Sequence, residues 1–223
     1  MIIAAALLLG AFTATASAQV APPALQALKP CYVSAGAEED RREGVVISAT
    51  GFTPQAVVDI LVDGVVVLSG QADVVGDVKA TVKAPFQANG EREFGVTLVQ
   101  QGDPSKTVGA LTRVTDLDVK LRPREARSSQ RVRFIGRGFT ADAGVFAHYV
   151  FRNRARKTVR LTRRAAGPCG TFAVRRRQIP IRRPRTGEWT LQIDQQRRYT
   201  AQPTTNWVRL SITLREVFDN PDL

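Results

Sequence analysis

An internal duplication limits the folds open to this chain, because its two halves carry the same landmarks in the same order. The clearest match is between residues 51–56 (GFTPQA) and residues 138–143 (GFTADA). The other matches, in chain order, are Gly76 with Gly170, Pro85 with Pro180, Gly90 and Glu91 with Gly187 and Glu188, and Gln100 and Gln101 with Gln195 and Gln196. With 223 residues, of which 43% are hydrophobic, the chain is long enough for two small cores. We therefore expect two similar modules in tandem.

Both copies show the two-residue period of β-strands. Val78, Ala80 and Val82 alternate with polar residues, which gives a strand one buried and one wet face. Between two apolar runs, Asp63 and Gly64 predict a hairpin, because a type I′ turn needs positive φ angles. After residue 18, no stretch keeps apolar residues at helical spacing for three turns. The sequence therefore predicts an all-β chain of two tandem antiparallel β-sandwiches, with about seven short strands in each.

The first residues have the pattern of an export signal. Residues 2–12 are an apolar run, and the sequence Ala-Ser-Ala at residues 16–18 follows as a cleavage site. A run this short does not span a bilayer, which takes about 20 apolar residues. We expect a secreted protein, extracellular or associated with the cell envelope, with no membrane span after cleavage. The expected segments are a signal peptide at 1–18, a linker at 19–27, a first sandwich at 28–115 and a second sandwich at 116–223.

The two cysteines, Cys31 and Cys169, fit an oxidising destination. An even number of cysteines in an exported chain predicts a disulfide, and the alternative is a pair of buried thiols without a bridge. A bridge between these residues would join the two copies. In the chain-entropy view it would stabilise the fold by about 4–5 kcal/mol, because it closes a long loop.

Residues 51–64 (GFTPQAVVDILVDG) resemble the Gly-Phe-x-Pro-x-x-x-Val stretch of bacterial surface immunoglobulin-like repeats. Residues 90–98 (GEREFGVTL) and 187–193 (GEWTLQI) resemble the later Gly-x-aromatic strand of the same repeats. The second copy departs from the pattern, because Ala141 stands where the first copy has Pro54. The resemblance implies immunoglobulin-like sandwiches, in a family whose members serve adhesion, spacing and carbohydrate contact. The whole chain also resembles exported proteins of high-GC actinobacteria.

Charge is divided unevenly between the copies. Up to Arg113 the chain has 8 Lys and Arg against 11 Asp and Glu, a net charge of −3. From Val114 onward it has 24 against 9, a net charge of +15, and 22 of these cations are Arg. The planar guanidinium group grips carboxylate, phosphate or sulfate with two hydrogen bonds at once. The second copy is therefore the candidate region for contact with an anionic partner.

The cations of the second copy gather in two clusters, one at the hairpin turn and one around Pro180. The candidate binding residues are Arg152, Arg154, Arg156, Lys157, Arg160, Arg163, Arg164, Arg175, Arg176, Arg177, Arg182, Arg183 and Arg185. Strict alternation from Phe172 and Val174 would point Arg176 into the core, where an unpaired charge is very costly. We therefore predict a β-bulge within residues 175–178 that turns Arg176 outward.

Two interpretations of these cations compete. A cationic face attracts anionic envelope polymers, such as teichoic acids or uronic polysaccharides, or an acidic protein, with a strong dependence on salt. Alternatively, the cations form a solvated face or pair with acids of the first copy, where Glu38, Glu39, Asp40 and Glu43 are available. We expect no nucleic-acid partner, because basic charge alone suits any polyanion and an exported chain rarely meets DNA or RNA.

The sequence presents no set of residues suited to catalysis. His148 is the single histidine, and a lone histidine on a strand is typical of a surface or hydrogen-bonded structural residue. Asp116 and Asp118 share a strand face but lack the further oxygen ligands that Ca²⁺ needs. Trp189 and Trp207 lie on strand patterns that predict core positions. We therefore expect no enzyme activity, no metal and no cofactor.

We predict an exported, non-catalytic binding module that contacts an anionic envelope polymer or an acidic protein partner through the Arg-rich second domain. The alternative is a structural spacer or assembly subunit with no specific ligand, whose charge serves solubility. An accessory domain of an enzyme is a third interpretation, and the sequence leaves the oligomeric state open.

Overall fold

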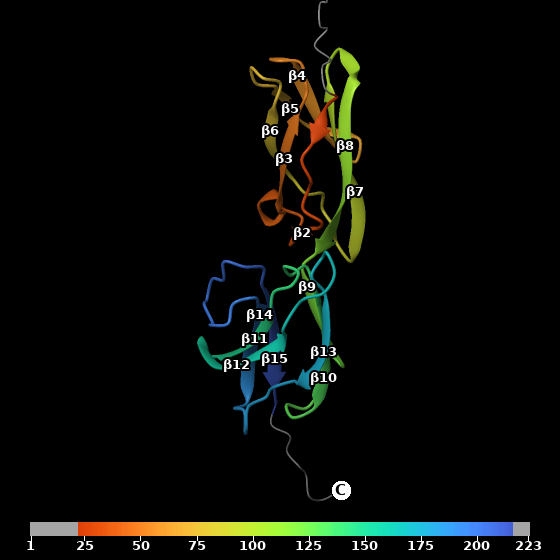
Figure 1. The fold of residues 1–223 in the computed structure, drawn as a ribbon. Helices are drawn as coiled ribbons and strands as arrows, with labels where there is room; N and C mark the ends of the chain where they lie inside the picture. Colours follow the sequence, from red (N-terminus) through yellow and green to blue (C-terminus); the bar gives the residue numbers. More distant parts are fainter. Residues whose placement is uncertain (1–21, 216–223) are drawn as a thin grey trace, which may run out of the picture.

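The structure is a computed structural model, and it describes residues 22–215. The signal peptide expected at residues 1–18 lies outside the described residues. The described chain forms two β-sandwiches that lie end to end, with the N-terminal sandwich uppermost in Figure 1. One short 3-10 helix, η1 (Glu39–Arg41), accompanies the strands of this part of the chain. The prediction of an all-β chain with two tandem immunoglobulin-like sandwiches is confirmed.

The first sandwich packs a three-stranded sheet on a five-stranded sheet. The smaller sheet has the order β1-β3-β6 and consists of β1 (Ala24–Leu25), β3 (Gly44–Thr50) and β6 (Val78–Lys83). The larger sheet has the order β2-β8-β7-β4-β5 and consists of β2 (Tyr32–Ser34), β4 (Val57–Val62), β5 (Val65–Gln71), β7 (Glu91–Gln100) and β8 (Asp103–Asp116). Their alternating apolar residues form one buried core, which includes Ile47, Ile60, Phe94 and Leu98.

The predicted linker at residues 19–27 is wrong near its end. Ala24 and Leu25 form β1, which pairs antiparallel with Thr50 and Ala49 of β3. Leu25 also packs against the core of the first sandwich. A strand of two residues is too short to show alternation, so the sequence pattern could not indicate it.

The second sandwich packs a three-stranded sheet on a four-stranded sheet. The smaller sheet has the order β13-β10-β9 and consists of β9 (Asp118–Arg122), β10 (Arg131–Arg137) and β13 (Phe172–Arg177). The larger sheet has the order β12-β11-β14-β15 and consists of β11 (Val145–Phe151), β12 (Arg154–Thr162), β14 (Gly187–Asp194) and β15 (Val208–Leu214). Its core is separate from the first and includes Phe134, Tyr149, Trp189 and Leu191.

The duplicated landmarks hold equivalent places in the two sandwiches. Gly76 and Gly170 both have positive φ angles, +87° and +58°. A Cβ at Gly76 would overlap the carbonyl oxygen of Phe52, and a Cβ at Gly170 would overlap that of Phe139. Only glycine fits such a close approach of two backbones. The Gly-Phe motif and the later glycine therefore form one local unit, which occurs once in each sandwich.

The aligned glutamines make the same hydrogen bond in both copies. The Gln100 side-chain oxygen accepts from the Thr53 amide at 2.9 Å, and the Gln195 side-chain oxygen accepts from the Thr140 amide at 2.7 Å. The Gly-Phe-Thr turn is thus tied to the end of β7 in one sandwich and to the end of β14 in the other.

The predicted hairpin turn is present, and the second copy builds it from different residues. Asp63 and Gly64 between β4 and β5 have φ angles of +50° and +79°, as a type I′ turn requires. Arg152 and Asn153 take the same positions between β11 and β12, with φ angles of +50° and +59°. The Arg152 guanidinium lies 5.4 Å from the centre of the Phe151 ring. A cation therefore sits at the tip of this turn.

Where the two sandwiches meet, covalent and ionic contacts join them. Cys31 and Cys169, which have a sequence separation of 138, form a disulfide, and this confirms the predicted bridge. Arg137 of β10 pairs with Asp116 at the end of β8, and it lies 3.6 Å from Asp118. The two carboxylates that the sequence presents as weak Ca²⁺ ligands are thus both in contact with a guanidinium.

Candidate functional site

The predicted binding residues from Arg152 to Arg177 lie on or next to one pair of sheet edges of the second sandwich. Strands β12 and β13 are edge strands of their two sheets, and they contact each other. The Arg176 guanidinium on β13 donates a hydrogen bond of 3.2 Å to the Leu161 carbonyl on β12. The last cluster, residues 182–185, is set apart from these strands, because it lies in the segment between β13 and β14 and its Pro184 borders a hollow between β9 and β15 at the opposite sheet edges. We call this side, formed by β12, β13 and the turns that continue them, the cationic side.

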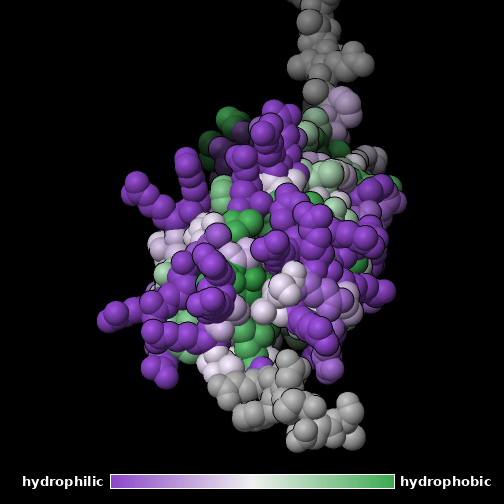
Figure 2. All heavy atoms as spheres, turned by 90° about the horizontal axis from the view of Figure 1, so that it is seen from below, coloured by the Kyte–Doolittle hydropathy of each residue, from purple (hydrophilic) through white to green (hydrophobic). Residues whose placement is uncertain are grey.

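The cations of the cationic side are available to a partner. All the predicted binding residues are exposed, and none of them forms an ion pair within residues 22–215. Figure 2 shows hydrophilic side chains projecting all around the second-sandwich end of the molecule. Two of the first copy's acids engage other groups, because Glu39 pairs with Arg42 at 3.2 Å and Glu43 with Lys29 at 2.6 Å.

The bulge predicted within residues 175–178 is wrong. Strand β13 pairs with β10 in unbroken register, and Arg176 lies opposite Val132. Arg176 is nevertheless exposed, because β13 is an edge strand and the long side chain reaches past the core to the Leu161 carbonyl. A register shift occurs instead between β11 and β12, where the pairing leaves Arg156 without a partner on β11.

A buried polar network on β11 and β14 was not anticipated from the sequence. His148 and Asp194 are both fully buried, and their side chains approach to 3.1 Å. The other ring nitrogen of His148 lies 2.9 Å from the Thr158 hydroxyl. Gln192, also fully buried, donates to Asp194 at 2.8 Å and to the Thr200 carbonyl at 2.9 Å. The network thus connects the sheet to the segment 195–207 that follows β14.

Hydrogen bonds determine the charge of Asp194 in this network. Burial raises the pKa of Asp194, but hydrogen bonds from His148, Gln192 and the Gln196 amide outweigh it and lower the pKa below its usual range. The order hydroxyl, imidazole and carboxylate resembles a hydrolase triad. However, the imidazole also contacts the Gln196 carbonyl at 3.1 Å and is fully buried. We interpret the network as structural, because it attaches the segment after β14 to the outer face of the sheet.

The side chains of β11 alternate between the two faces of its sheet. Val145, Ala147 and Tyr149 lie on the face toward the core, and His148 lies on the outer face. What the sequence pattern did not indicate is that the segment 195–207 covers that face. Tyr199 of this segment lies with its ring centre 5.8 Å from that of His148. The cover depends on contacts distant in sequence, which a strand period cannot reveal.

The two tryptophans have different surroundings. Trp189 is buried in the second core, where its ring packs against Phe151 at a centroid distance of 4.8 Å. Trp207 is 38% exposed, and the Arg209 guanidinium lies 4.5 Å from the centre of its ring. The core position expected for Trp207 is therefore wrong, because its ring stacks with a cation at the surface.

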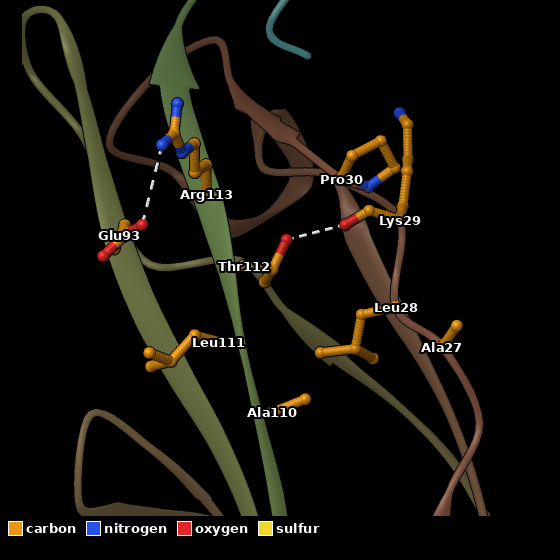
Figure 3. Close-up of a pocket in the computed structure, with 9 residues that line it drawn as sticks. All are labelled: Ala27, Leu28, Lys29, Pro30, Glu93, Ala110, Leu111, Thr112 and Arg113. Atoms are coloured by element: carbon orange, nitrogen blue, oxygen red, sulfur yellow. Dashed lines mark hydrogen bonds and ion pairs between the residues drawn. The ribbon is translucent and has the colours of Figure 1, made fainter.

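Each sandwich also has a hollow beside its last strand. In the first sandwich it has a volume of about 370 Å³ and lies between residues 27–30 and 110–113, as Figure 3 shows. In the second sandwich the hollow has a volume of about 1200 Å³ and lies between β9 and β15. It extends along residues 209–215 and is bordered by residues 124–129. The larger hollow lies at the pair of sheet edges opposite β12 and β13.

Residues 22–215 contain no group of three or more His, Cys, Asp or Glu side chains placed to hold a metal ion. Within the same residues, no helix has both the length and the apolar character needed to cross a membrane.

No protein-family model and no curated protein matches the chain. Among solved structures, the human OSCAR ligand-binding domain aligns with 87% of this chain and 98% of its own, at 8% identity and a TM-score of 0.35. A 1.5-MDa bacterial ice-binding adhesin aligns with 87% of this chain and 64% of its own, at 12% identity and a TM-score of 0.31. The FN1–FN3 domains of chicken CNTN1 align with 87% of this chain and 67% of their own, at 9% identity and a TM-score of 0.26. Likenesses this weak identify no ligand and no partner.

Proposed function

We propose that the protein is an exported, non-catalytic binding protein whose cationic side holds an anionic polymer of the cell envelope. The observation that carries the proposal is the placement of the cations on two adjacent edge strands, exposed and without ion pairs within residues 22–215. Guanidinium groups bind carboxylate, phosphate and sulfate groups alike. A uronic polysaccharide or a teichoic acid presents such groups at regular intervals.

The length of the cationic side favours a polymer. Strand β12 has 9 residues, which at the rise of an antiparallel strand gives a row of roughly 27 Å. Arg154, Arg156, Lys157 and Arg160 follow one another along it. A row of separate charges gains by binding several anionic groups of one chain at the same time, because the later contacts become intramolecular.

Export is supported by the signal-like residues 1–18 and by the Cys31–Cys169 disulfide. Disulfides persist in oxidising compartments and are rare in the cytosol. A bond that joins two modules fits a protein that works outside the cell, where no glutathione reduces it.

The test is a salt-gradient elution of the mature chain from a heparin column, followed by a column of immobilised polyuronate. The variant changes Arg175→Gln, Arg176→Gln and Arg177→Gln together. The matched control changes Arg122→Gln, Arg124→Gln and Arg127→Gln, which removes the same charge on the opposite side of the sandwich. We expect the first variant to elute at clearly lower salt than the control, because the row of cations along β12 and β13 contacts several anionic groups of one polymer at once.

Equal shifts in the two triple variants would show that retention follows net charge alone. That result would favour the alternative function, a spacer or assembly subunit whose charge serves solubility. A chain that keeps residues 1–18 and stays in the cytosol of its host would contradict the proposed export.

A further inference from the structure

The hollow of the first sandwich is closed by a strand. Strand β2 runs parallel to β8 and pairs Tyr32 with Val114 and Ser34 with Asp116. Just before β2, the Lys29 carbonyl accepts a hydrogen bond of 2.6 Å from the Thr112 hydroxyl, as Figure 3 shows. The outer edge of β8 is therefore satisfied at this end, and only about 370 Å³ remains open beside it.

The second sandwich has no such strand among its described residues. The pairs Leu25–Ala49 and Val119–Gly136 are equivalent in the two copies, so residues 126–128 correspond to β2. In the second copy this segment turns away, and the Ser128 carbonyl accepts a hydrogen bond of 3.0 Å from the Ile179 amide. Strand β15 is consequently the last strand of its sheet. The hollow beside it is about 1200 Å³, which is three times the volume in the first sandwich.

The walls of this larger hollow combine an apolar floor with a cationic rim. Leu121 of β9 and Leu210, Ile212 and Leu214 of β15 line it, and all four belong to the second core or pack against it. The rim carries several guanidinium groups that form no ion pair within residues 22–215. These are Arg122, Arg124, Arg127 and Arg215.

We propose that this hollow is a strand-acceptor groove, in which an extended segment of a partner protein pairs with β15 as β2 pairs with β8. The edge of β15 offers a ladder of backbone donors and acceptors, which a peptide satisfies and a polysaccharide does not. The apolar floor selects apolar side chains at every second position of the segment, because strand side chains alternate between two faces. The rim selects acidic residues between them. The site is distinct from the cationic side and does not depend on the polymer binding proposed there.

The chain's own last residues suit the groove poorly. Residues 216–223 read EVFDNPDL, in which Val217 and Phe218 are adjacent and Pro221 has no amide hydrogen to donate. This sequence therefore cannot present apolar groups at every second position. A separate acidic partner is the occupant to which the chemistry of the groove points.

The test uses the mature disulfide-bonded chain and the fluorescein-labelled peptide Asp-Tyr-Glu-Val-Asp-Val-Glu, with binding measured by fluorescence anisotropy. Two control peptides have the same composition. In one the apolar residues are contiguous, and in the other alternate backbone amides are N-methylated. We expect the alternating peptide to bind about tenfold or more tightly than either control, because only it both fills the floor and pairs with the strand edge.

Charge-swap variants localise the site. Arg124→Glu with Arg127→Glu is expected to abolish binding of the acidic peptide and to create binding of a peptide with Lys in place of the acids. Arg197→Glu with Arg198→Glu, in the exposed segment between β14 and β15 and outside both the groove and the cationic side, changes the net charge equally and is expected to retain binding within about twofold. Hydrogen exchange should show slower exchange of β15 amides when the peptide is bound.

Equal affinity for the three peptides, or an equal loss of affinity in the two charge-swap variants, would overturn the proposal. Either result would show that the peptides bind through charge alone. Deletion of residues 216–223 that raises peptide affinity tenfold would instead identify the chain's own tail as the occupant. A dimer in sedimentation that Arg124→Glu and Arg127→Glu dissociate would identify a second copy. Either result would overturn the assignment to a separate partner.

Discussion

The two sandwiches share one strand plan and differ at their edges. Strand β5 of the first sandwich exposes Val65 and Val66, whereas the matching strand β12 of the second exposes Arg154, Arg156 and Arg160. Charged side chains on an edge strand prevent its pairing with other sheets, so β12 is protected where β5 is not. The residues that fill the core preserve the fold in both copies. The two copies differ in the side chains that their edge strands expose.

The outer faces of the central strands differ in the same way. Leu61 lies opposite Thr97 in the first sandwich, and both are half-buried. Their equivalents in the second sandwich, His148 and Gln192, are fully buried under the segment 195–207. The outer sheet face is therefore only half-buried at this position in the first sandwich. In the second sandwich the same face carries a buried polar network under an additional segment.

Removal of the bond between the two sandwiches should have the largest effect. Cys31→Ser with Cys169→Ser is expected to lower the free energy of unfolding by about 4–5 kcal/mol, since the bond closes a long loop of the unfolded chain. We also expect the transitions of the two sandwiches to move further apart, because only the main chain then joins them. Differential scanning calorimetry measures both effects, and the unchanged chain under reducing conditions is the control. An unaltered melting temperature would contradict the prediction.

Two equivalent glycines allow each sandwich to be destabilised alone. Gly76→Ala and Gly170→Ala should each cost about 3 kcal/mol, because the new Cβ overlaps a carbonyl oxygen of the Gly-Phe turn. Both tryptophans lie in the second sandwich, so tryptophan fluorescence follows the unfolding of that sandwich only. Gly170→Ala should therefore shift the fluorescence transition in denaturant, and Gly76→Ala should shift only the transition seen by circular dichroism.

Gly64→Ala is the matched control for these variants. Gly64 also has a positive φ, +79°, but a Cβ there has open space around it. We expect a loss of about 1 kcal/mol, from the backbone conformation alone. Equal losses of stability in Gly64→Ala and Gly76→Ala would show that the overlap with the Phe52 carbonyl oxygen adds no cost to the substitution at Gly76.

A smaller effect is expected from the polar layer that only the second sandwich has. The pKa of Asp194 is lower in the folded protein than in the unfolded chain, so its ionised form stabilises the fold at neutral pH. This contribution is lost as the pH falls below about 4 and through the folded pKa. Asp194→Asn should therefore lower stability by about 2 kcal/mol at pH 7 and weaken the acid dependence of the fluorescence transition.

The first sandwich supplies a control for this titration. Asp59 also has a lowered pKa, caused by hydrogen bonds from Ser69 and Gln101, but it is only half-buried. Asp59→Asn should leave the fluorescence transition unchanged at every pH, because the tryptophans report on the other sandwich. An Asp194→Asn chain that keeps the full acid dependence would show that other carboxyls govern it.

Much of the fold could be predicted from local signals. The two-residue period of β6, the Asp63–Gly64 turn and the duplicated Gly-Phe landmarks each depend on a few neighbouring residues, and the structure contains all of them. The disulfide followed from the number of cysteines and the expected export. These features are encoded within one or two elements, so no knowledge of the packing was needed.

The features that could not be predicted depend on distant contacts. The burial of His148 requires the segment 195–207 to cover β11, and the exposure of Arg176 requires β13 to lie at the edge of its sheet. The hollow beside β15 exists because residues 126–128 pair with the segment after β13 instead. Periodicity describes the two faces of one strand, but it does not describe which strand ends a sheet or what lies above it.

The position of the disulfide has a mechanical consequence. A pulling force applied across the described chain passes through the bond between Cys31 and Cys169, since this is the shortest covalent route. The residues between the two cysteines, which include most of the first sandwich and β9 to β12, then bear no load. Only the segments outside the bypass can lengthen under tension. Under tension such a molecule would extend by a short length and then resist further extension, as a tether of limited length does.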